Sequence, residues 1–171
     1  TPHVDEKEAT IEIRSEITND ATEKATLEVI HQIYDPQGKL QQTLKQQLSV
    51  KAGETQTVRK TSAIGQPQLW SPESPRLYEI VTTLRNPKTG MELDRSTHKT
   101  GFRWFSFDGE KGFSLNGKPY KLRGVNRHQD QAPVGVALDD EAHRRDIRLI
   151  KEMGCNFIRI AHYPQDDALV E

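Results

Sequence analysis

Residues 123–130 read Arg-Gly-Val-Asn-Arg-His-Gln-Asp, and residues 159–164 read Arg-Ile-Ala-His-Tyr-Pro. Each segment has the pattern of a short strand that carries a histidine, His128 or His162, at its carboxyl end. Residues 139–153, between the two segments, have the pattern of an amphipathic helix. A strand, a helix and a strand at this spacing predict a parallel βαβ unit. Its polar side chains would gather at the carboxyl edge of the strands, where parallel α/β folds bind their ligands.

The predicted helix has recognisable ends. Asp139 or Asp140 can cap its first turn, and Gly154 can end it. Its apolar stripe is predicted from Ile147, Leu149, Ile150 and Met153. A parallel unit of this kind needs further strands to close into a barrel or a doubly wound sheet, so we expect the chain to hold only the beginning of such a fold.

Short runs of alternating apolar and polar residues fill the stretch from residue 9 to residue 100. Turn sequences separate these runs, such as Asp-Pro-Gln-Gly at residues 35–38 and Asn-Pro-Lys-Thr-Gly at residues 86–90. About seven short strands with turns every 8–12 residues are typical of an immunoglobulin-like β-sandwich. We place this sandwich at residues 1–103.

The sequence changes character after residue 103. Aromatic residues become frequent, and residues 113–120 contain the pair Asn116-Gly117, which is typical of a tight hairpin. The chain is therefore predicted to be mainly β, with a sandwich at residues 1–103 and a hairpin followed by the βαβ unit at residues 104–171.

The charges of the chain nearly cancel, with 24 Lys and Arg against 25 Asp and Glu. A near-neutral chain lacks the basic surface that binds nucleic acid or an anionic membrane, so we expect neither partner. No apolar run is long enough for a membrane span or a signal sequence. The sequence is compatible with a cytoplasmic as well as a periplasmic or secreted protein.

Several chemistries are open to the two histidines. Backbone carbonyls in the loops could satisfy both rings without any ligand. His128, Asp130 and His162 could together hold a metal ion, since an oxygen and two imidazoles suit zinc or manganese. Alternatively, His, Arg, Asn and Asp side chains at the mouth of a barrel could bind sugar hydroxyls while two carboxylates elsewhere perform the chemistry.

An ordered series of short motifs runs through residues 69–164. The motifs are Leu-Trp-Ser-Pro at 69–72, Pro-Arg-Leu-Tyr at 75–78, Gly-Phe-Arg at 101–103, Leu-Asn-Gly-Lys-Pro at 115–119, Arg-Gly-Val-Asn-Arg-His at 123–128, Asp-Asp at 139–140, Met-Gly at 153–154, Asn156, Arg159 and Ala-His-Tyr-Pro at 161–164. In this order they resemble glycoside hydrolase family 2, and within it the β-galactosidases.

The resemblance implies a fragment of a large retaining exo-glycosidase that hydrolyses terminal β-galactosides. In that family a sugar-binding jelly roll precedes the sandwich, and a (β/α)8 TIM barrel follows it. Residues 104–171 would then hold the hairpin and first βαβ unit of a truncated catalytic barrel. The acid/base and nucleophile glutamates would lie on later strands, beyond residue 171. We therefore expect no catalytic residue in this chain and no activity from it alone.

The resemblance also implies the substrate-binding residues. His128 and His162 match histidines that line the galactose pocket, and Asn126 and Arg159 match positions beside it. Asp130, the carboxylate immediately beside a pocket histidine, completes the predicted set. No metal or cofactor is expected in this chain, whereas the parent enzyme could use a divalent cation. The parent is expected to be a homo-oligomer that acts on a β-galactoside.

The sequence departs from the family after the first histidine. Residues 129–133 read Gln-Asp-Gln-Ala-Pro, where the family commonly has an acidic residue and then a second His or a Pro. β-Glucuronidases share the sandwich and a related first strand, so a glucuronide stays open as the substrate, although Asn-Arg-His at 126–128 and Tyr-Pro-Gln at 163–165 favour a galactosidase. A non-catalytic sandwich module is the other class of function, but it would have no need of a βαβ tail.

Overall fold

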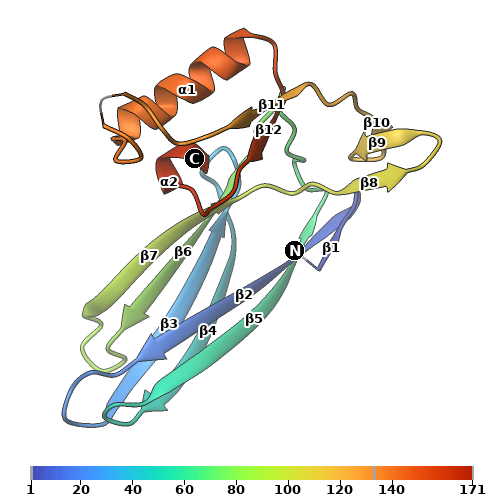
Figure 1. Cartoon of the computed structure of the whole chain (residues 1–171). Helices are drawn as coiled ribbons and strands as arrows, with labels where there is room; N and C mark the ends of the chain where they lie inside the picture. Colours follow the sequence, from blue (N-terminus) through green and yellow to red (C-terminus); the bar gives the residue numbers. More distant parts are fainter. Residues whose placement is uncertain (1, 133, 171) are drawn as a thin grey trace. The chain divides into compact units, whose positions relative to one another are not determined.

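The computed structural model describes residues 2–132 and 134–170 (Figure 1). The chain divides into two compact units, the first formed by Thr1–Ser106 with Leu115–Gly117 and the second by Phe107–Ser114 with Lys118–Glu171. The domain boundary expected after residue 103 stays a prediction, and by spatial contacts the first unit extends to Ser106.

The first unit is an antiparallel β-sandwich, as the alternating pattern predicted. One sheet has the strand order β1-β2-β5 and the other the order β4-β3-β6-β7. The strands are β1 (His3–Val4), β2 (Glu8–Thr18), β3 (Ala25–Tyr34), β4 (Leu40–Val50), β5 (Thr55–Gly65), β6 (Tyr78–Arg85) and β7 (Glu92–Thr100).

Two apolar clusters form the core of the sandwich. One contains Ile11, Ile33 and Phe102, and the other contains Val29 and Val58. Apart from Phe102, which follows β7, these residues come from strands of both sheets, so the alternation that predicted each strand also selects most of the side chains that fill the space between the sheets.

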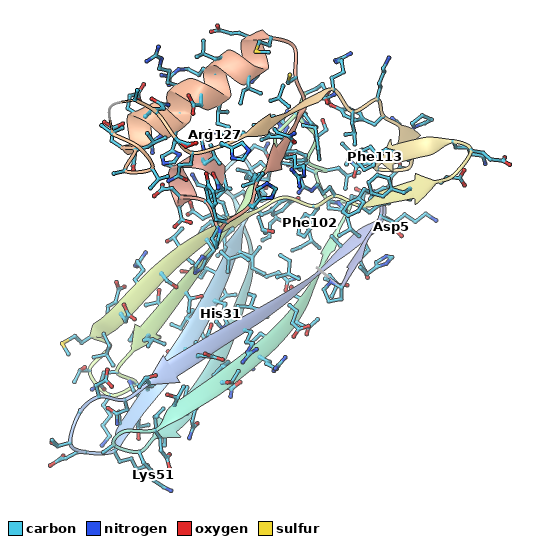
Figure 2. All side chains as sticks on the ribbon, in the orientation of Figure 1. Asp5, His31, Lys51, Phe102, Phe113 and Arg127 are labelled. Atoms are coloured by element: carbon cyan, nitrogen blue, oxygen red, sulfur yellow. The ribbon has the colours of Figure 1, made fainter. Side chains whose placement is uncertain are left out.

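A histidine lies among these apolar side chains. His31 is carried by β3 of the sandwich (Figure 2). It is 0% exposed, because it occupies an inward position between Val29 and Ile33. Its Nδ1 atom lies 3.0 Å from the hydroxyl of Thr82 on β6, and its Nε2 atom is buried without a hydrogen-bond partner among the described residues. Burial, and after it the positive charge of Lys60, holds the pKa of His31 below its ordinary value of 6.5.

The second unit contains the predicted βαβ arrangement. Its elements are β11 (Gly124–Arg127), α1 (Asp140–Glu152), β12 (Phe157–Ile160) and α2 (Asp167–Val170). A small sheet of β8 (Phe105–Asp108), β9 (Gly112–Leu115) and β10 (Lys118–Pro119) contains residues of both units. Asn116 and Gly117 join β9 to β10 with positive φ angles of 50° and 74°, so the predicted tight hairpin is confirmed.

Helix α1 agrees with its predicted ends but only in part with its predicted stripe. The Asp139 side chain caps the helix by accepting the Ala142 N–H at 2.8 Å. Leu149 and Met153, expected on the buried face, are 48% and 71% exposed, and the buried residue is His143. Successive residues are rotated by about 100° around the helix axis. Leu149 therefore lies outside the face centred on His143, and Met153 lies at the margin of that face. In the described part of the chain, neither helix is long and apolar enough to cross a bilayer.

The depressed pKa of His31 predicts that the stability of the sandwich depends on pH. Below pH 6.5 the unfolded chain binds a proton on His31 that the folded chain resists, so the free energy of unfolding should fall with decreasing pH. The slope from this one group is at most about 1.4 kcal/mol per pH unit. Urea unfolding between pH 7 and pH 5 should show a flatter dependence in His31→Gln. The control His98→Gln, at an exposed position of β7, should behave as the wild type, and an unchanged slope in His31→Gln would contradict the prediction.

Candidate functional site

The candidate site is built on the parallel pair of strands β11 and β12. Their register places Gly124 opposite Phe157 and Asn126 opposite Arg159. Because successive side chains alternate between the faces of a sheet, Asn126 and Arg159 share one face and Arg127 lies on the other. Asn126 and Arg159 are exposed, whereas Arg127 is 5% exposed.

The two predicted histidines lie together at the carboxyl edge of this pair. His128 directly follows β11, and His162 comes two residues after the end of β12. Their ring centroids are 5.7 Å apart, in an edge-to-face arrangement at 64°. Both rings are exposed, so either could bond a ligand at this edge. The expectation that the histidines open on one side of adjacent parallel strands is confirmed.

The loops that carry the histidines are joined to each other. The backbone N–H of Gln129 donates to the hydroxyl of Tyr163 at 2.8 Å. The peptide bond between Ala161 and His162 is cis, and Ala161 is 0% exposed. Asp130 is exposed in the loop after His128. The structure therefore groups the histidines at one edge, with Asn126 and Arg159 on the adjoining face and Asp130 in the neighbouring loop.

A buried arginine underlies the site. The Arg127 guanidinium donates from Nε and Nη2 to Oδ2 of Asp146, at 2.9 and 2.8 Å, and from Nη1 to the side-chain oxygen of Gln165 at 3.0 Å. Its Nη2 atom also lies 3.2 Å from Nδ1 of His143. Since a guanidinium can only donate, Nδ1 of His143 is the acceptor of this bond. Asp146 in turn accepts from the side chain of Gln131 at 3.2 Å.

The sequence reasoning assigned no role to Arg127, Asp146 or Gln165. A signal for Arg127 was present, because the alternation in β11 places it on the face opposite Asn126, where α1 packs, and a buried arginine needs a partner. No local pattern identified that partner, since Asp146 lies on the helix and Gln165 beyond the second strand.

The geometry limits the chemistry of the site. Within residues 2–132 and 134–170, no three His, Cys, Asp or Glu side chains form a group that could hold a metal ion, so the structure gives no support to the metal site at His128, Asp130 and His162. Asp130 is the one carboxylate in the predicted set, whereas retaining glycoside hydrolysis needs two carboxyl groups. The arrangement can donate and accept hydrogen bonds at the edge of a sheet, as sugar recognition requires.

The sequence matches known family models in both of its parts. The model described as glycosyl hydrolases family 2 matches residues 1–103, which is more than half of the chain. The model described as glycosyl hydrolases family 2, TIM barrel domain, matches residues 108–171.

Individual relatives differ in the sugar that they are named for. The chain is similar to β-glucuronidase 2 of Bacteroides uniformis, with 62% identity and a TM-score of 0.96 over 99% of this chain and 20% of that one. A variant of that enzyme with two aspartates replaced by alanine is described as a calcium binding mutant. The β-galactosidase BoGH2A of Bacteroides ovatus is 34% identical over 100% of this chain and 20% of its own length. A β-glucuronidase of Bacteroides fragilis is 47% identical over 60% of this chain and 14% of its own length. The chain spans at most a fifth of these relatives.

The close approach of β11 to β12 predicts that Gly124 cannot be enlarged. A Cβ atom on Gly124 would lie 2.6 Å from a ring carbon of Phe157 and 2.8 Å from the Phe157 carbonyl oxygen. Because that oxygen belongs to the paired backbone, Gly124→Ala should weaken the strand pair by about 1–3 kcal/mol. Amide hydrogen exchange in residues 124–127 and 157–160 would measure the loss. Gly109→Ala is the matched control, since an added Cβ there meets no atom within 4 Å, and equal protection in the two variants would contradict the prediction.

Proposed function

Since the chain belongs to the glycosyl hydrolases of family 2, we propose that it is part of a retaining exo-glycosidase that hydrolyses terminal β-linked sugars. The observation that carries the proposal is the pair of histidines at one carboxyl edge, with ring centroids 5.7 Å apart. This is the edge of a parallel sheet at which α/β enzymes bind their substrates. A non-catalytic sandwich module would leave this edge without a purpose.

In the proposed enzyme the described residues recognise the sugar and do not cleave it. His128 and His162 bond sugar hydroxyls, while Asn126, Arg159 and Asp130 supply further donors and acceptors around them. The two catalytic carboxyl groups, about 5–5.5 Å apart in a retaining enzyme, come from parts of the protein outside this chain. A hydrogen bond from His162 to a ring hydroxyl contributes more as the sugar flattens toward the oxocarbenium state, so it favours the transition state over the bound substrate.

For the sugar itself we favour a β-glucuronide. The support is the 62% identity with the Bacteroides uniformis enzyme over nearly the whole chain. A β-galactoside is the second candidate, supported by BoGH2A over the full length of the chain and by the motifs at residues 126–128 and 163–165. That the whole protein is a homo-oligomer stays a prediction.

The proposal is tested with the whole protein and aryl glycosides of both sugars. We expect turnover of the β-glucuronide to exceed that of the β-galactoside, and no turnover of either by residues 1–171 alone. His162→Phe should lower kcat on the order of 100-fold while raising KM by less, because the lost bond acts mainly in the transition state.

The control is His98→Phe, at an exposed position in the sandwich, which should keep the wild-type constants. Turnover by the isolated chain, or full kcat in His162→Phe, would refute the corresponding part of the proposal. A higher rate on the galactoside would assign the second candidate sugar.

The sequence left a divalent cation open for the parent enzyme, and we propose that such a cation binds at Asp140 and Asp166. The two aspartates replaced in the Bacteroides uniformis calcium binding mutant have the same separation along the sequence as Asp140 and Asp166. No other pair of aspartates in this sequence has that separation.

The structure brings the neighbours of both aspartates together. Gln165, next to Asp166, and His143, one helical turn after Asp140, both contact the guanidinium of Arg127. No third acidic, His or Cys ligand joins them among the described residues. Calcium accepts backbone carbonyls and waters as further ligands, so on this proposal the two carboxylates would supply only the charged part of the site.

Calcium removal gives a test that does not depend on activity. A chelator should lower the Tm of the whole protein, because an ion that binds only the folded state stabilises it by mass action. Asp140→Ala and Asp166→Ala should each remove most of this effect. Asp20→Ala, at an exposed position in the sandwich, should retain it. An equal effect of the chelator on wild type and Asp166→Ala would contradict the assignment.

A further inference from the structure

Each of the two loops that carry a histidine contains a glutamine that bonds to the ion pair of Arg127 and Asp146. Gln131 lies three residues after His128, and Gln165 lies three residues after His162. Gln165 accepts a hydrogen bond from the Arg127 guanidinium at 3.0 Å. Gln131 donates to Asp146, whose other oxygen accepts from that guanidinium at 2.8 and 2.9 Å. Both loops are therefore connected through one buried ion pair.

This ion pair occupies a fixed place in the second unit. Arg127 is the last residue of β11, and its side chain is on the face opposite Asn126. Asp146 and His143 hold it from the inner face of α1. The Arg127 side chain is 5% exposed and that of Asp146 is 23% exposed, so the pair is shielded from solvent and from salt. A planar guanidinium with several donors in a fixed geometry connects three elements in a way that lysine cannot reproduce.

We infer that Arg127 is a positioning residue that holds His128 and His162 at their mutual spacing. The inference rests on the proposed function, since it assigns to Arg127 the alignment of two groups that bind the sugar. Arg127 does not touch the substrate itself, because its side chain points away from the face and edge where the substrate binds. It acts by preventing the loops at residues 128–131 and 161–165 from moving independently. The bond between Gln129 and Tyr163 is a second and weaker connection between these loops.

Loss of this anchor should act on the transition state more than on substrate binding. Two histidines that can drift still bond the hydroxyls of a flexible ground state, but they lose the alignment that the flattened sugar needs. In the whole protein, Arg127→Met should therefore lower kcat on the order of 10- to 100-fold and change KM less. Arg127→Lys, which keeps the charge without the planar fork, should fall between Arg127→Met and the wild type.

The matched control is Arg148→Met on the same helix as Asp146. Arg148 is paired with Glu141, and its side chain is 56% exposed. This variant makes the same chemical change in the same unit without touching the anchor, so its kinetic constants should equal those of the wild type. A fall in kcat in Arg148→Met as large as in Arg127→Met would overturn the inference.

A double-mutant cycle separates positioning from general loss of structure. If Arg127 acts through the histidines, Arg127→Met should have little further effect on kcat in the His162→Phe background. The same fold-loss in both backgrounds would show that Arg127 acts elsewhere, and would overturn the inference.

Failure of the proposed function would show separately, as absence of turnover of both aryl glycosides by the wild-type protein. The inference can still be decided in that case from crystal structures of the whole protein. Arg127→Lys and Arg127→Met should change the separation of the His128 and His162 rings from 5.7 Å, and Arg148→Met should not. An unchanged separation in both Arg127 variants would refute the positioning role.

Discussion

The parallel pairing of β11 with β12 determines which side chains meet in the second unit. With Gly124 opposite Phe157 and Asn126 opposite Arg159, the odd-numbered residues of β11 face α1 and the even-numbered ones face the open side. A slip of one residue in β11 would turn its side chains to the wrong face, and would replace buried Arg127 by Asn126. The approach of Phe157 to Gly124 reinforces this register, because only glycine leaves room for the Phe157 carbonyl at this distance.

The buried ion pair is better understood as a source of geometric specificity than of stability. Taking a guanidinium and a carboxylate out of water costs several kcal/mol for each ion, which their attraction only partly offsets. Removing one partner alone costs about 3–5 kcal/mol, since the other is left buried and uncompensated. Such a pair penalises any arrangement in which Arg127 and Asp146 do not meet. It therefore fixes the rotation of α1, which turns His143 and Asp146 inward and leaves Leu149 exposed.

The features that depend on neighbouring residues in the sequence could be predicted from it. Alternation located the sandwich strands, and even the burial of His31 follows from its place between Val29 and Ile33. The carboxyl-edge rule brought His128 and His162 together. The connection through Arg127 escaped prediction because its partners, Asp146 and Gln165, are 19 and 38 residues away and have no motif of their own. The apolar stripe of α1 was predicted correctly at Ile147 and Ile150, which are half-buried, and wrongly at Leu149 and Met153, because the buried centre of the inner face is the polar residue His143.

Sugar recognition and bond cleavage have different structural needs, and on the proposed function this chain serves the first. Hydroxyl groups can be bound at a strand edge by exposed polar side chains, so on this proposal the two histidines line one side of the bound sugar. Cleavage with retention needs two carboxyl groups across the scissile bond, one kept protonated and one ionised by different surroundings. The predicted set at the ends of β11 and β12 contains one carboxylate, Asp130. It therefore cannot provide both a protonated and an ionised carboxyl group. On the proposed function, the histidine edge therefore supplies alignment to carboxylates held by other strands. The rigidity of that edge, rather than any acid or base in it, is then what these residues contribute to the rate.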